Sequence, residues 1–267
     1  MEKGKADYGN WVSNYVLQLL VIVTLGAVVV LAAVEWAFHQ PVVTGLAALL
    51  VVLMLVMLVY MWLCRRAFAF DGGGLMGMFH AYLVEHLDWD GRGTLLDVGC
   101  GSGALSIRCA KQFPEAEVVG IDYWGKMWNY GKAQCECNAA AESVANRIRF
   151  ERGDAARLAF ADDAFDAVVS NFVFHEVKTQ PDKQQLVLEA LRVLKPGGSF
   201  AFQDLFDSKM VYGDIRRLFD RLRADGYTDL HYIGQVERQG FVPRFLRAPW
   251  MICHIGLIYG RKPGGQA

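Results

Sequence analysis

Hydrophobic residues dominate the first quarter of the chain, where two long stretches contain no charged side chain. These stretches cover residues 8–34 and 42–64. Each is long enough to cross a hydrocarbon core of about 30 Å as a helix, which takes roughly 20 residues. The short link between them predicts an antiparallel pair of transmembrane helices, at about residues 11–38 and 42–64, that anchors the protein in a membrane.

A cleaved signal peptide and a buried hairpin of a soluble protein are the alternatives for these stretches. The first stretch is longer than the roughly 7–15 apolar residues of a signal peptide, and a second one follows at once. Helices that are apolar on all faces would also need a larger protein around them. Lysines at positions 3 and 5 precede the pair, Arg65 and Arg66 follow it, and the link has neither Lys nor Arg. The positive-inside rule therefore predicts a two-pass protein with both termini, and with them the whole chain after Arg66, facing the cytoplasm.

Beyond Arg66 the pattern changes to short apolar runs that alternate with segments of helical periodicity, as in an α/β protein. Four apolar runs predict strands near residues 94–97, 117–122, 148–152 and 165–171, a fifth run covers 199–206, and a last strand is expected over 251–260. Helices are expected over residues 75–87, 104–112, 124–141, 184–194 and 214–223.

The stretch TLLDVGCGSGA, residues 94–104, predicts a buried strand that ends in a tight turn and opens a helix. Its glycines suit a turn that needs positive φ and close approach to a ligand, while the next helix offers unpaired N–H groups. The spacing also fits the G-x-G-x-x-A pattern of dinucleotide-binding folds. A carboxylate at Asp97 would repel a pyrophosphate, but it suits the ammonium and sulfonium groups of S-adenosylmethionine (SAM).

At these residues the sequence resembles the class I SAM-dependent methyltransferases, whose first motif has the form hhDhGxGxG. Further motifs of the family follow in order: EVVGIDYW at 117–124, IRFERGDAA at 148–156, FDAVVSNFVFHEV at 165–177 and LKPGG at 194–198. The broad pattern is most similar to the group that includes quinone C-methyltransferases, and it covers the cofactor half only. The resemblance implies a Rossmann-like seven-stranded sheet whose last strand lies antiparallel beside the fifth, preceded by the transmembrane α-helical hairpin.

The resemblance also implies roles for individual residues in these motifs. Asp122 would bind both ribose hydroxyls, Asp154 would accept from the adenine amino group, Ala155 would offer its backbone N–H, and Asn171 would line the methyl-transfer face. The helix over residues 75–87 would cover the cofactor. The full set expected to bind SAM is Asp97, Gly99, Cys100, Gly101, Gly103, Asp122, Tyr123, Asp154, Ala155 and Asn171.

Methyl transfer from a sulfonium depends mainly on alignment, and a base matters only if the acceptor must lose a proton. His175 and Glu176, in the loop after the fourth strand, are the candidate catalytic residues, because a histidine exchanges protons near neutral pH. A loop-shaping role for His175 is the alternative. Asp204, at the end of the fifth strand, is a weaker candidate.

The membrane hairpin favours a lipid-like or quinone-like methyl acceptor, and a soluble small molecule is the alternative. A net charge of −1 without a basic surface argues against nucleic acid, and the six cysteines are expected to be free thiols rather than a metal site. An NAD(P)-binding oxidoreductase and a membrane-anchored SAM-binding scaffold without catalysis are the other classes considered.

The expected boundaries are an anchor over 1–66, a linker and covering helix over 67–93, the methyltransferase domain over 94–262, and a disordered tail over 263–267. The aromatic and basic stretch at 240–250 is expected either to contact the membrane surface or to form a strand at the sheet edge.

Overall fold

The computed structural model describes residues 4–70, 74–124 and 131–264, which fall into two compact units. One unit consists of residues 9–76, and the other combines the residues up to Tyr8 with those from Gly77 onward. The first residues were expected to belong to the membrane anchor. The structure instead places the described residues 4–8 in the unit that carries the glycine-rich turn. Residues 265–267 of the expected tail lie outside the described residues.

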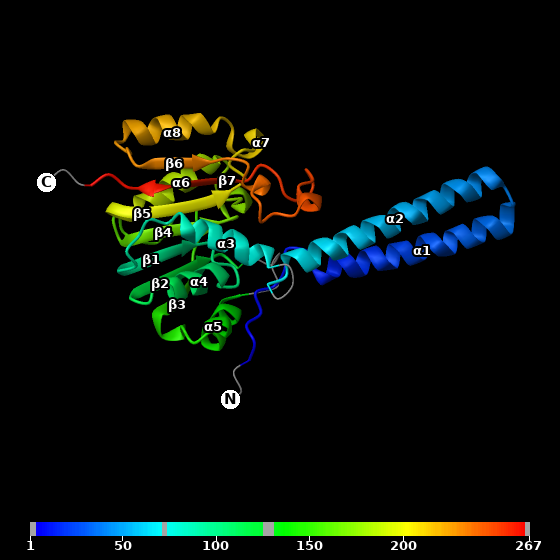
Figure 1. The fold of residues 1–267 in the computed structure, drawn as a ribbon, viewed down its shortest axis with the longest axis horizontal. Coiled ribbons are helices and arrows are strands. Elements are labelled where there is room, and N and C mark those ends of the chain that lie inside the picture. Colours follow the sequence, from blue (N-terminus) through cyan, green and yellow to red (C-terminus); the bar gives the residue numbers. More distant parts are fainter. Residues whose placement is uncertain (1–3, 71–73, 125–130, 265–267) are drawn as a thin grey trace. The chain divides into compact units, whose positions relative to one another are not determined.

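The smaller unit is a pair of long helices, α1 (Asn14–Phe38) and α2 (Pro41–Phe68), that run antiparallel side by side (Figure 1). Both are long and apolar enough to cross a membrane, and only 6% of the most apolar stretch of each helix is buried inside the protein. α1 begins at a Ser13 cap and ends where His39 adopts positive φ. α2 begins at Pro41 and extends four residues beyond its expected end, because the helical pattern continues through Arg65 and Arg66.

The larger unit is built on a seven-stranded sheet in the order β3-β2-β1-β4-β5-β7-β6. The strands are β1 (Gly93–Val98), β2 (Ala116–Asp122), β3 (Ile148–Arg152), β4 (Phe165–Asn171), β5 (Leu194–Asp204), β6 (Leu230–Ile233) and β7 (Gly256–Arg261). β1 to β5 form parallel pairs, and β7 runs antiparallel between β5 and β6. The expected α/β fold, with its last strand antiparallel beside the fifth, is confirmed.

Helices cover both faces of this sheet (Figure 1). α4 (Ala104–Gln112) and α5 (Lys132–Ala141) follow β1 and β2, whereas α6 (Lys183–Arg192), α7 (Lys209–Tyr212) and α8 (Ile215–Ala224) share one apolar core with β4 and β5. α3 (Leu75–Glu85) precedes β1. Because the strand order reverses between β1 and β4, the carboxyl ends of these two strands are where a ligand binds in such sheets.

The structure differs from the sequence expectation in four further places, three of them in the C-terminal third. The last strand starts at Gly256 rather than at residue 251, because the buried Glu237 carboxylate accepts the N–H groups of His254 and Ile255 and the chain turns at His254, whose φ is 61°. The edge strand is β6, a strand that the expected seven-stranded sheet requires but whose position was not predicted, and residues 240–250 contain a short 3-10 helix at Arg244–Leu246 instead of a strand. The expected helix over 124–141 is observed from Lys132, and residues 125–130 lie outside the described residues.

Candidate active site

The glycine-rich turn connects β1 to α4 and carries three glycines at positive φ. The φ angles are 78° at Gly99, 56° at Gly101 and 84° at Gly103. A Cβ atom on Gly99 would lie 2.2 Å from Cγ2 of Val173, which belongs to the loop after β4. Glycine is therefore required at position 99 for its backbone conformation and for the close approach of that loop.

Asp97 lies at the end of β1 with 1% of its surface exposed. Its Oδ2 accepts a hydrogen bond from the Ser106 hydroxyl at 2.5 Å, whereas its buried Oδ1 has no hydrogen-bond partner among the described residues. Burial raises the pKa of Asp97 to about 7, and the Ser106 hydrogen bond only partly opposes this effect. An unpaired buried carboxylate oxygen is costly, and a cationic ligand would relieve that cost.

Asp122, at the end of β2, is bonded to the turn. Its Oδ2 accepts from the backbone N–H of Gly101 at 2.9 Å, and its Oδ1 accepts from that of Trp124 at 2.7 Å. The Trp124 indole N–H in turn donates to the Gly101 carbonyl at 2.9 Å. Each carboxylate oxygen can accept a second hydrogen bond, so the pair of hydroxyls on a ribose still fits Asp122.

The expected adenine end of the site is formed by the turn after β3 and by Tyr123. Asp154 Oδ1 accepts from the N–H of Ala156 at 2.9 Å and from the Thr179 hydroxyl at 3.1 Å. Ala155 lies between Asp154 and Ala156 in this turn, half-buried. The Tyr123 side chain is 57% exposed, with the guanidinium of Arg152 over its ring at 5.0 Å. These contacts connect the loop after β4, through Thr179, to the turn after β3.

Two carboxamides meet at the carboxyl ends of β4 and β5. Gln203 donates from Nε2 to Oδ1 of Asn171 at 2.7 Å, and the Phe172 N–H donates to the Gln203 carbonyl at 2.7 Å. Gln203 is 1% exposed, and its Oε1 has no hydrogen-bond partner among the described residues. Asn171 thus has a neighbour that sequence reasoning missed, and this neighbour presents a second buried acceptor without a partner.

His175 forms a pair with Asp204. Its Nδ1 lies 2.6 Å from Oδ1 of Asp204, which is 1% exposed, and its Nε2 lies 3.9 Å from a carboxylate oxygen of Glu176. Burial by itself lowers the pKa of His175, but the hydrogen bond and the charge of Asp204 outweigh it, so the net pKa is raised. A carboxylate on Nδ1 fixes the tautomer that leaves Nε2 to accept a proton.

Aromatic rings lie next to this part of the sheet. The Phe79 ring, on α3, contacts the rings of Phe172 and Phe241 edge-to-face, each with centroids 5.4 Å apart, and Tyr82 contacts Phe241 at 5.3 Å. Phe172 follows Asn171 directly, so these rings border the carboxamide pair. α3 therefore contributes an aromatic side chain beside the end of β4.

The structure brings together most of the residues that the sequence singled out. Hydrogen bonds join Gly101 to Asp122, Val173 touches the position of Gly99, and His175 pairs with Asp204. The Cys100 side chain is buried, and burial raises the pKa of its thiol. Sequence reasoning missed Trp124, Gln203 and the pairing of Asp204 with His175. The position of these residues near strand ends is the one feature of the sequence that could have indicated them.

This arrangement fits SAM. The unpaired Oδ1 of Asp97 suits the ammonium group, and the turn allows close backbone approach to the ligand. Asp122 retains acceptor capacity, and Asp154 lies in the turn after the neighbouring strand β3. The polar side chains of the site are carboxylates and carboxamides. Their negative charge and their acceptor oxygens favour a ligand with positive charge and hydroxyl groups over a pyrophosphate.

The sheet order and this strand-end site define the class I SAM-dependent methyltransferase fold. Residues 96–202, less than half of the chain, match the family model described as a methyltransferase domain. The cofactor that this match indicates is SAM.

Curated relatives are methyltransferases by name. The chain is 32% identical over 139 residues to "Ubiquinone/menaquinone biosynthesis C-methyltransferase UbiE" of Geotalea daltonii, which covers 52% of this chain and 56% of the relative. It is 30% identical to a demethylmenaquinone methyltransferase of Lactiplantibacillus plantarum, with 54% and 62% covered, and 37% identical to an arsenite methyltransferase of Aquipseudomonas alcaligenes, with 49% and 36% covered. The chain thus spans about half the length of the first of these relatives.

Among solved structures, the [4+2]-cyclase SpnF shares the fold with a TM-score of 0.54 and 22% identity, over 70% of this chain and 82% of that one. Phosphoethanolamine N-methyltransferase 2 of Haemonchus contortus follows with a TM-score of 0.52 and 17% identity, over 69% and 52%. At these identities the likeness concerns the fold alone. The cyclase name shows that the fold by itself does not dictate the reaction.

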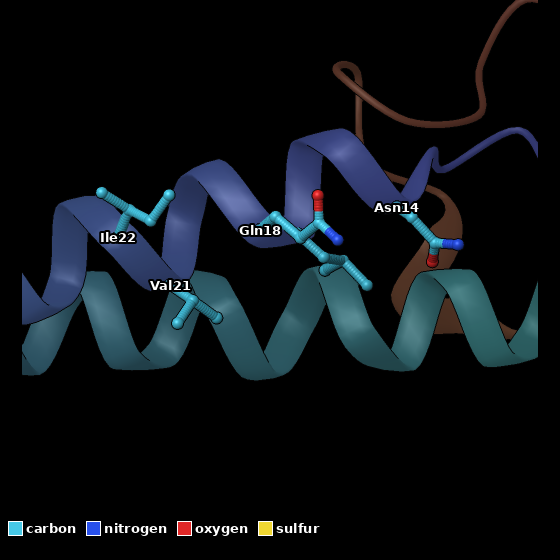
Figure 2. Close-up of a pocket in the computed structure, with 5 residues that line it drawn as sticks. Asn14, Gln18, Val21 and Ile22 are labelled. Atoms are coloured by element: carbon cyan, nitrogen blue, oxygen red, sulfur yellow. The ribbon is translucent and has the colours of Figure 1, made fainter.

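A separate hollow lies on the surface of α1, in the smaller unit (Figure 2). It is open, and it is lined by residues of that one helix: Asn14, Leu17, Gln18, Val21 and Ile22. None of them is charged. The hollow lacks the convergent polar groups of a ligand site and is not a candidate active site.

Proposed function

We propose that this chain is a SAM-dependent methyltransferase that is anchored in a membrane by α1 and α2 and methylates a small, membrane-dissolved, quinone-like acceptor. The observation that carries the proposal is the connected strand-end site, in which an unpaired buried carboxylate, a glycine turn and a second carboxylate converge inside the segment matched to the methyltransferase family. The anchor follows from the two exposed apolar helices, and the flanking basic residues favour a cytoplasmic catalytic unit.

In this proposal SAM supplies an electrophilic methyl group with a neutral leaving group. Asp97 pairs with the ammonium group, Asp122 accepts from the ribose hydroxyls, and Asp154 accepts from the adenine amino group. These contacts fix the cofactor against the turn, so that the chain contributes mainly position and alignment to the reaction.

His175 is the proposed general base. Asp204 accepts a hydrogen bond from the Nδ1–H group of His175, so the lone pair on Nε2 is available. Nε2 then takes a proton from a hydroxyl group of the methyl acceptor as the methyl group is transferred. The resulting imidazolium lies between two carboxylates, Asp204 at Nδ1 and Glu176 near Nε2. Glu176 thus stabilises the charge on His175 rather than acting as the base itself.

Three observations support an aromatic acceptor with hydroxyl groups. The rings of Phe172 and Phe241, which pack against the buried Phe79, are partly exposed beside the carboxamide pair, and Gln203 Oε1 offers a buried acceptor beside Asn171. Two of the relatives are named for quinone methylation. A membrane anchor raises the effective concentration of the enzyme toward an acceptor dissolved in the bilayer.

The test uses the full chain in lipid nanodiscs. Calorimetric titration with SAM, S-adenosylhomocysteine and NADH separates the classes of cofactor, and methyl-labelled SAM then measures transfer to a prenylated naphthohydroquinone and to a soluble naphthohydroquinone. The proposal expects binding of the two adenosyl compounds but not NADH, and faster transfer to the prenylated compound.

Each alternative has its own outcome. NADH binding without SAM binding would support an oxidoreductase. SAM binding without label transfer to either naphthohydroquinone would overturn the proposed acceptor, and an absence of label in total membrane extracts as well would support the scaffold.

A further inference from the structure

Residues 4–8 belong to the larger unit, and two of them, Asp7 and Tyr8, make specific hydrogen bonds within it. Asp7 is bonded through its backbone to the Asn138 carboxamide on α5. The Asp7 N–H donates to Oδ1 of Asn138, and the Asn138 Nδ2 donates back to the Asp7 carbonyl, both at 2.8 Å. Gln134 adds a third bond by donating to the Asp7 carbonyl at 3.2 Å. One side chain thus holds both backbone groups of one residue.

The same contacts continue into the glycine-rich turn. Asn138 Nδ2 also donates to the Ser102 carbonyl at 2.9 Å, and the Ser102 hydroxyl donates to the Tyr8 carbonyl at 3.0 Å. Ser102 lies between Gly101 and Gly103, and the N–H of Gly101 donates to the Asp122 carboxylate. Asn138 is 1% exposed, and its bond to the Ser102 carbonyl is buried, whereas its bonds to Asp7 and the bond from Ser102 to Tyr8 are partly buried. Hydrogen bonds therefore lead from Asp7 through Asn138 to Ser102, and the peptide bond between Ser102 and Gly101 connects them to the Gly101–Asp122 hydrogen bond.

We propose that the backbone of Asp7 and Tyr8, together with Asn138 and Ser102, forms a clamp that positions the glycine turn for SAM. The proposal rests on the proposed function, because it concerns the same cofactor site. Three glycines at positive φ give the unclamped turn many alternative conformations, and ordering them costs free energy. In the clamped turn these conformations are already fixed when the protein folds, so SAM binding does not include the free-energy cost of ordering the turn. Residues 7 and 8, which lie far outside the matched segment 96–202, thereby act as positioning residues for the cofactor.

Two variants of the full chain in nanodiscs remove different bonds of the clamp. Asp7→Pro removes the N–H that donates to Oδ1 of Asn138. Ser102→Ala removes the hydroxyl that donates to the Tyr8 carbonyl. Each is expected to weaken SAM affinity by about tenfold, the effect of one or two net hydrogen bonds. At saturating SAM, kcat is expected to stay within about twofold of wild type, because no variant touches the reacting groups.

Matched controls change the same elements without touching the clamp. Gly4→Pro places a proline upstream in the same segment. Tyr8→Phe removes only the hydroxyl that donates to Glu142, and Glu136→Ala alters the exposed side of α5. All three are expected to bind SAM like wild type. Ser102→Thr retains a hydroxyl and is expected to recover most of the affinity lost in Ser102→Ala.

The outcomes separate this inference from the proposed function. If wild type binds no SAM, the proposed function fails. If wild type binds SAM and folded Asp7→Pro and Ser102→Ala bind it equally well, the clamp is overturned. Thermal unfolding shows whether each variant is folded. A loss of SAM affinity in Gly4→Pro or Ser102→Thr equal to that in the clamp variants would also overturn the clamp.

Discussion

Asp97 has an unusual combination of burial, a pKa near 7 and an oxygen without a partner among the described residues. A carboxylate pairs with the ammonium group of SAM, and a carboxyl group does not. Below about pH 7 binding must therefore release a proton from Asp97, so SAM affinity should fall as the pH falls. The decline should approach tenfold per pH unit well below the pKa.

Calorimetry from pH 8 to pH 5.5 measures this dependence, and buffers of different ionisation enthalpy count the protons released. Asp97→Asn is the matched control, because it should bind SAM weakly and without this pH dependence. A wild-type affinity that is flat across the range would contradict the pairing of Asp97 with the ammonium group.

Asp204 controls the pKa of His175 in the opposite direction to burial. The base form of His175 exists above its raised pKa, so the acidic limb of the pH profile of kcat should report this group. In Asp204→Asn the charge is lost and burial dominates, so the limb should move to lower pH. Because the imidazole also loses its orienting partner, kcat on the plateau should drop by roughly tenfold or more.

Label-transfer kinetics at saturating SAM measure this profile, and SAM affinity should be unchanged. Glu176→Gln, the control, removes the more distant carboxylate and should shift the limb less. An unmoved limb in Asp204→Asn would remove His175 as the base.

At the scale of elements, the turn between β1 and α4 depends on the loop after β4. In Gly99→Ala the new Cβ meets Val173, and the residue must also keep a φ of 78°. The left-handed conformation alone costs about 1–2 kcal/mol for a residue with a Cβ. Gly99→Ala should therefore lower the midpoint of thermal unfolding and weaken SAM binding.

The double variant Gly99→Ala/Val173→Ala separates the two causes. Removing the Val173 methyl groups relieves most of the overlap but not the backbone strain, so stability should recover only in part. Near-UV circular dichroism in detergent measures the midpoints. A Gly99→Ala variant as stable as wild type would show that the turn is not constrained as described.

At the scale of the whole molecule, the proposed topology places the link between α1 and α2 on the side of the membrane opposite to the catalytic unit. Gln40 in this link and Cys137 on α5 are both exposed. In intact cells a membrane-impermeant maleimide should label Gln40→Cys but not the native Cys137, and lysis should make Cys137 reactive. Labelling of Cys137 in intact cells would show that the catalytic unit lies outside the cytoplasm, which contradicts the proposed topology.

The sequence was most informative where local chemistry is restrictive. The strand, turn and helix at residues 94–112 follow from alternating glycines after an apolar run, because few residue types tolerate positive φ and the observed α4 has the expected bounds. It was least informative near β6 and β7. Strand pairing there depends on contacts distant in sequence, such as Glu237 with the N–H of Ile255.

The amino-acid sequence by itself determined the α/β class and the two apolar helices, because these depend on local periodicity, and the resemblance of its motifs to the class I methyltransferases added the seven-stranded sheet. Only the tertiary structure decided which side chains meet. It joined His175 to Asp204, Asn171 to Gln203, and Asp7 to Asn138. These partners lie between 29 and 131 positions apart, and no pattern within one segment can specify a contact that the packing of several elements creates.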